Sequence, residues 1–73
     1  MAAKIVNLAY PDEDETLCAT VEEARETLAA MLERFKSRGC RVDEQHMPYE
    51  DYPQYAVYDC DDGWIGTHMI ELQ

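Results

Sequence analysis

The chain has 73 residues, of which 47% are hydrophobic, and its 16 acidic and 6 basic side chains give a formal net charge of -10. This length predicts a single domain, residues 1–73, with one small core. The charge argues against direct binding of nucleic acid and of an anionic membrane surface, because both need a basic face. It favours a basic partner protein, although acidity also serves solubility alone.

Cysteine usage and apolar runs bear on the compartment. Cys18, Cys40 and Cys60 make an odd count without a C-x-x-C pair, which is not typical of a disulfide framework. Residues 1–10 lack the apolar segment and cleavage site of a signal peptide, and no run approaches the ~18 apolar residues of a membrane span. We therefore expect a protein of the reducing cytoplasm, without membrane contact.

The first strand is predicted over residues 4–10, which read KIVNLAY and are closed by Pro11. Both of its faces carry apolar groups, which favours a place at or beside the centre of a sheet. The four acids of residues 12–15 must be exposed to solvent. If residues 16–19 form a short second strand, the acidic run is the tip of a hairpin.

An amphipathic helix is predicted over residues 20–39. Thr20 and Glu23 match the T-x-x-E capping box, and Gly39 stands where a left-handed residue ends a helix. The apolar stripe follows the helical period: Ala24, Leu28, Met31, Leu32 and Phe35. This stripe must be covered by the flanking strands.

Two strand regions follow the helix. Residues 40–47 alternate loosely and indicate a half-exposed edge strand, and residues 48–53 form a proline-bracketed loop. Residues 54–60 and 64–72 form a hairpin around Asp61-Asp62-Gly63; with a two-residue loop, Val57 faces His68. A three-residue loop would change those partners. The face toward the helix is then Tyr55, Val57, Trp64, Ile70 and Leu72, and the other face carries Tyr58, Ile65, Thr67 and Met69.

Together these elements predict an α+β fold, with one amphipathic helix packed on a small antiparallel sheet of 3–5 strands. Their order is strand, short strand, helix, strand, hairpin.

No constellation predicts catalysis, a metal site or a cofactor. The cysteines, His46 and His68 lack the ligand pairs, two to four residues apart, that are typical of zinc sites, and the calcium-loop pattern is absent. A cysteine beside a histidine is the pairing that activates a nucleophile, yet so small a fold leaves little material for a pocket of roughly 300 Å³ beside its core. We expect no enzyme activity.

The tyrosines recur at every third position from Tyr49 through Tyr52 and Tyr55 to Tyr58, and Pro53 excludes a continuous helix there. Tyr55 is assigned to the core. Tyr49 and Tyr52, beside two acids, are expected to contact a partner, because tyrosine is enriched at interfaces. The alternative is that these rings anchor the loop onto the sheet.

Acids interspersed with tyrosines imitate the charge spacing of nucleic-acid phosphates. In size, acidity and α+β make-up the chain resembles the small phage-encoded anti-CRISPR inhibitors. That resemblance implies a non-enzymatic inhibitor in the host cytoplasm, which occludes the basic groove of a larger protein such as a CRISPR effector complex. The predicted contacts are Asp12, Glu13, Asp14, Glu15, Tyr49, Glu50, Asp51, Tyr52, Asp61 and Asp62.

The rival hypothesis is a small homodimeric structural or accessory module. Its contact would be the exposed sheet face with Tyr58, Ile65 and Met69. The sequence leaves monomer and homodimer open.

Overall fold

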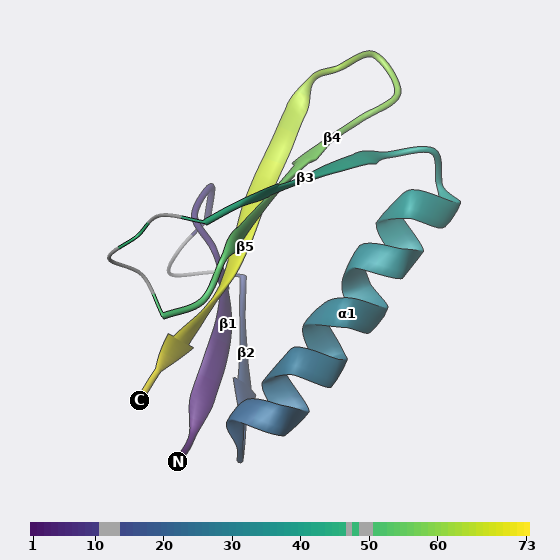
Figure 1. Cartoon of the computed structure of the whole chain (residues 1–73). Coiled ribbons are helices and arrows are strands. Elements are labelled where there is room, and N and C mark those ends of the chain that lie inside the picture. The colour runs from purple at the N-terminus through teal and green to yellow at the C-terminus, as the bar shows by residue number, and fades with distance from the viewer. Residues whose placement is uncertain (11–13, 47, 49–50) are drawn as a thin grey trace.

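The described part of the chain, residues 1–10, 14–46, 48 and 51–73 of a computed structural model, forms five antiparallel strands with one helix across one face (Figure 1). The elements are β1 (Ala3–Asn7), β2 (Glu15–Cys18), α1 (Val21–Ser37), β3 (Arg41–Gln45), β4 (Gln54–Tyr58) and β5 (Trp64–Leu72). The strands lie in the order β2-β1-β5-β4-β3. The predicted α+β fold and its order of elements are confirmed.

β1 lies between β2 and β5, beside the centre of the sheet, as its two apolar faces predict. It ends earlier than predicted because the chain turns after Asn7, whose carbonyl accepts a hydrogen bond from the Tyr10 N–H at 2.9 Å. β2 pairs with β1 and is the second strand that the sequence left open. β3 is an edge strand, as predicted.

The ends of α1 follow the predicted signals. The Thr20 side chain accepts a hydrogen bond from the Glu23 N–H at 3.1 Å, and the Glu23 carboxylate reaches back to the Ala19 N–H at 3.4 Å. Gly39 has a φ of 87°, which glycine adopts without strain, and its N–H donates to the Lys36 carbonyl at 3.0 Å. The helix therefore starts and stops where its local sequence directs.

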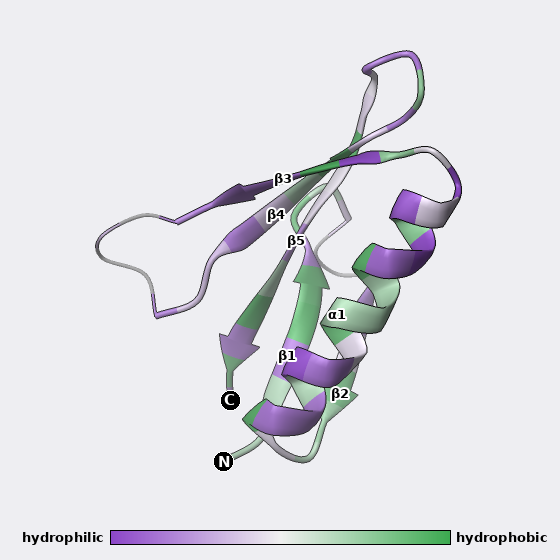
Figure 2. Ribbon diagram, turned by 45° about the vertical axis from the view of Figure 1, so that its right-hand side comes forward, coloured by the Kyte–Doolittle hydropathy of each residue, from purple (hydrophilic) through white to green (hydrophobic). Residues whose placement is uncertain are grey.

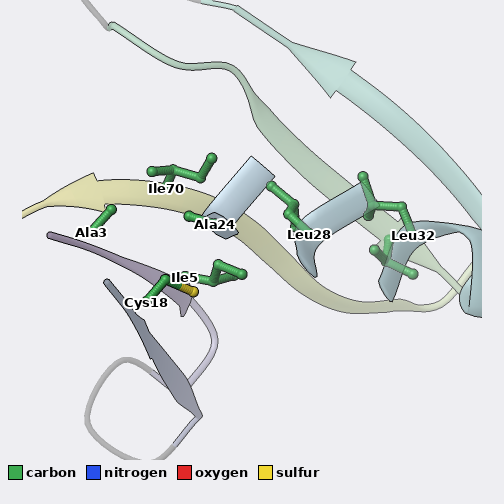
Figure 3. Close-up of a cluster of buried hydrophobic side chains, with 8 residues drawn as sticks. Ala3, Ile5, Cys18, Ala24, Leu28, Leu32 and Ile70 are labelled. Atoms are coloured by element: carbon green, nitrogen blue, oxygen red, sulfur yellow. The ribbon is translucent and has the colours of Figure 1, made fainter. Parts of the chain in front are cut away.

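The core lies between α1 and the covered face of the sheet. Hydrophobic and hydrophilic segments both occur along α1, as an amphipathic helix requires (Figure 2). Ala24, Leu28 and Leu32 lie along α1 next to strand side chains that include Ile5 and Ile70 (Figure 3). The buried cluster is Ala3, Ile5, Cys18, Ala24, Leu28, Leu32, Val57 and Ile70.

The predicted register of the β4–β5 hairpin is wrong by two residues. Val57 pairs with Gly66 rather than with His68, and the next pair is Tyr58 with Trp64, so Ile65 is an extra residue in β5. The turn sets this register: the Asp59 carboxylate accepts hydrogen bonds from the N–H groups of Asp61 and Gly63 at 2.9 and 2.8 Å.

The turn and the bulge together move Trp64 off the helix side, where it was expected. The Asp59 N–H donates to the Gly63 carbonyl at 2.8 Å, and Asp62 has a φ of 62°, so the loop has three residues rather than two. Trp64 instead pairs with Tyr58 on the face that α1 leaves uncovered, and its indole N–H donates to Thr67 Oγ1 at 2.9 Å.

Candidate functional site

The sheet topology divides the predicted contact residues between two ends. β1 and β4 both run antiparallel to β5, so the loops that follow them leave the sheet in the same direction, but β1 ends opposite His68 and β4 ends opposite Trp64. We call Asp14 and Glu15, which follow β1, together with Asp61 and Asp62, which follow β4, the acidic end. Asp51 and Tyr52 precede β4 and lie at the opposite end. Asp12, Glu13, Tyr49 and Glu50 fall outside the described residues.

Several carboxylates of the acidic end are engaged within the chain. Glu15 forms an ion pair with Lys4 at 3.2 Å, and Asp62 lies 3.5 Å from Arg41 Nε. The Asp14 carboxylate accepts a hydrogen bond from Asn7 at 3.1 Å. The Asp61 carboxylate, in contrast, forms no ion pair with another described residue, so it is the carboxylate of this end that is most available to a partner.

A buried asparagine holds the loop after β1 in place. Asn7 Oδ1 accepts hydrogen bonds from the N–H groups of Ala9 at 3.0 Å and Thr67 at 3.3 Å, while Nδ2 donates to Asp14. Gly66 makes room for this side chain, because a Cβ there would lie 2.8 Å from both Asn7 polar atoms. The loop after β1 is thereby tied to β5.

His68 is a core residue. It is buried, and its ring centroid lies 5.5 Å from that of Phe35 on α1. Burial lowers the pKa of His68, which Asp14 opposes, so the imidazole is neutral near pH 7. Its place against Phe35 is a packing role.

A groove of about 340 Å³ lies between α1 and the start of β4. Its floor is apolar, with Leu28, Leu32 and Ile70, and its rim carries Arg25, Ala29, Asp51, Tyr52, Pro53 and Tyr55. The expectation that the fold lacks material for a pocket of this size is therefore wrong. The groove arises because residues 51–53 stand beside the flank of α1 and wall off a space that neither layer encloses alone.

The two described rim tyrosines are both tied to the fold. The Arg25 guanidinium lies 5.3 Å from the centroid of the Tyr52 ring, and Tyr52 packs against the core, as the anchoring alternative predicted. Tyr55 is half-buried beside the core, and burial together with a hydrogen bond to Glu44 raises the pKa of its phenol. Tyr52 thus belongs to the groove wall rather than to a free loop tip.

No described helix or strand packs on the sheet face opposite α1, although Val6 and Thr67 of this face are buried. Leu17 is 71% exposed and Trp64 is 52% exposed, and strand alternation places both on this face with Val6, Tyr58 and Met69. Arg41 stacks 4.4 Å from the Tyr58 ring centroid and pairs with Asp43 at 3.0 Å. Leu17 was missed at the level of sequence, since β2 is too short for its alternation to be seen.

The remaining candidate chemistry is sparse in the described part of the chain. No group of three or more His, Cys, Asp or Glu side chains there converges as a metal site would require. Cys18 is buried, Cys40 is half-buried and Cys60 is exposed, and all three are free thiols. Within the same residues, no helix has both the length and the apolar character to cross a bilayer.

Comparison with known proteins adds no assignment: no family model, no curated protein and no solved structure matches the chain.

Proposed function

We propose that this protein is a non-enzymatic inhibitor that binds a larger partner protein and occludes a basic, nucleic-acid-binding site, as anti-CRISPR proteins do. One observation carries the proposal: two acidic loops that are far apart in the sequence leave the sheet in the same direction. The loop after β1 carries Asp14 and leads to Glu15, and the loop after β4 carries Asp61 and Asp62. A net charge of -10 adds a long-range field of the same sign.

The mechanism is electrostatic and steric. A groove that binds phosphates is lined with arginine and lysine, and its affinity for nucleic acid comes largely from those cations. The acidic end competes for the same cations, and the body of the fold then blocks the groove. Such a complex weakens as the salt concentration rises, because screening reduces the attraction between the two surfaces.

Charge reversal at the acidic end tests the proposal. Bacteria that carry a CRISPR system and express the protein should allow a targeted phage to form plaques. Asp61→Lys should reduce this effect at least tenfold. The matched control is Glu71→Lys, which makes the same charge change on the exposed end of β5, at the opposite end of the sheet. Equal loss in both variants, or no effect of the natural protein on any CRISPR type, would refute the proposal.

A second candidate is the homodimeric structural module. The exposed Leu17 and Trp64 favour it, because apolar side chains on an uncovered sheet face are suited to burial against a copy of themselves. They join Tyr58, Ile65 and Met69, the contacts expected from the sequence. Sedimentation at several protein concentrations distinguishes the candidates: a dimer that Trp64→Ser dissociates supports this one, and a strict monomer removes it.

A further inference from the structure

The groove between α1 and the start of β4 has an apolar floor and an acidic surround, and neither feature is used by the acidic end. We infer that the groove receives an apolar side chain from a basic peptide segment of the partner protein. This inference rests on the proposed function in one respect, since both assume a basic partner. It adds a second contact, at the other end of the sheet, with its own chemistry.

The dimensions of the groove suit one large side chain. Its volume of about 340 Å³ lies at the lower end of the range for ligand pockets, roughly 300–1,000 Å³. Leu28, Leu32 and Ile70 offer only carbon atoms at the floor, so a leucine side chain, or an indole whose N–H faces the polar rim, would leave no polar group unpaired there. Interfaces commonly depend on one such anchor in a pocket.

The charges around the groove select basic flanking residues. The flank of α1 that carries Ala29 also carries three exposed glutamates, at i, i+4 and i+11 of the helical period: Glu22, Glu26 and Glu33. Glu33 pairs with Lys36 at 3.4 Å, which leaves Glu22 and Glu26 as the carboxylates of this flank that form no ion pair with a described residue. Asp51 lies on the opposite wall, and Glu44 is hydrogen-bonded to Tyr55. The cation of the rim, Arg25, lies over the Tyr52 ring. Lysine or arginine on either side of the anchor would therefore meet carboxylates.

The same charges argue against a second copy of this chain as the occupant. A copy brings another net charge of -10 to a groove that is already surrounded by carboxylates. Like charges brought together in this way repel, and they raise the free energy of the complex. A basic segment has the opposite sign and is attracted before contact.

Three synthetic pentapeptides test the inference by nuclear magnetic resonance titration. Their sequences are Lys-Lys-Trp-Lys-Lys, Lys-Lys-Ala-Lys-Lys and Glu-Glu-Trp-Glu-Glu, each with blocked ends. The first should bind at least tenfold more tightly than either of the others, because only it combines the anchor with the complementary charge. Its binding should shift the methyl signals of Leu28, Leu32 and Ile70.

Two alanines of α1 provide a matched pair of variants. Both are exposed, but Ala29 lines the groove and Ala30 does not. Ala29→Trp should fill the groove and weaken binding of the tryptophan peptide at least tenfold, whereas Ala30→Trp should leave it within twofold. Equal binding of the tryptophan and alanine peptides, methyl shifts elsewhere, or equal effects of the two variants would overturn the inference.

The inference and the proposed function fail in different ways. If Ala29→Trp abolishes peptide binding but leaves inhibition of the CRISPR system undiminished, the groove does not hold the partner and the proposed function stands. If the natural protein binds the tryptophan peptide in the groove but inhibits no CRISPR system, the groove binds basic segments of some other partner and the proposed function falls.

Discussion

The contact between Gly66 and Asn7 makes a sharp prediction about stability. The backbone of Gly66 is not in the left-handed region, so alanine is conformationally acceptable there. Its Cβ, however, would lie 2.8 Å from both polar atoms of the Asn7 amide. Gly66→Ala must therefore displace the buried Asn7 side chain and disturb its hydrogen bonds to Ala9, Asp14 and Thr67.

The magnitude follows from those three hydrogen bonds. Each contributes about 0.5–1.5 kcal/mol, and the bond to a charged carboxylate contributes more. We expect Gly66→Ala to lower the free energy of unfolding by about 2–3 kcal/mol. In the Asn7→Ala background the Asn7 amide no longer meets the Cβ at position 66, so adding Gly66→Ala should change the free energy of unfolding by less than about 0.5 kcal/mol. The coupling energy of the double-mutant cycle is then about 2 kcal/mol.

Urea denaturation followed by circular dichroism measures all four proteins of the cycle. For a chain of this length, 1 kcal/mol corresponds to a shift of about 4–8 °C in Tm, so thermal unfolding provides a second measurement. If the two substitutions are additive, or if Gly66→Ala alone is neutral, then Asn7 does not depend on the space that Gly66 leaves. The account of how the loop after β1 is held would be refuted.

Three further predictions concern the cap, the buried histidine and the thiols. Thr20→Ala should lower the free energy of unfolding by about 1 kcal/mol in urea denaturation, and Thr20→Ser should restore it, because serine also caps. Burial places the pKa of His68 below its ordinary value of 6.5, so the unfolded chain binds more protons than the folded one. The free energy of unfolding should therefore fall as the pH drops from about 6.5 toward the folded pKa. A pH series of denaturation curves on His68→Leu should lack this component. A thiol reagent should modify Cys60 at once and Cys18 only after unfolding, as mass spectrometry of the labelled peptides can check.

Local signals in the sequence were sufficient for most of the fold. The Thr20 cap, the Gly39 stop and the apolar stripe between them each depend on residues within a few positions, and the structure confirms them. The register of the hairpin was not predictable in the same way. It depends on the Asp59 carboxylate, which binds two backbone N–H groups of the turn and fixes a three-residue loop.

The candidate site was predicted less well than the fold, for a physical reason. Acidic loops are visible in a sequence, but which of them leave the sheet in the same direction depends on the pairing of β1 and β4 with β5. The groove was missed because it forms between Leu28 on α1 and Pro53 before β4, residues with no local relation. Tyr52 was expected at a partner contact, and its stacking with Arg25 is a tertiary interaction that no spacing indicates.

The middle of the sheet is filled by β5, the last strand in chain order. Until it arrives, β1 with β2 and β3 with β4 are two separate hairpins that share no ladder. During synthesis the amino-terminal hairpin and α1 emerge first, and their apolar surfaces stay exposed to water until β5 is made, in which Thr67 follows its β1 partner Asn7 by 60 positions. Folding should consequently be slow for so small a chain, on the millisecond-to-second scale of non-local topologies. During that time the apolar surfaces of the hairpin and of α1 would be accessible to a chaperone.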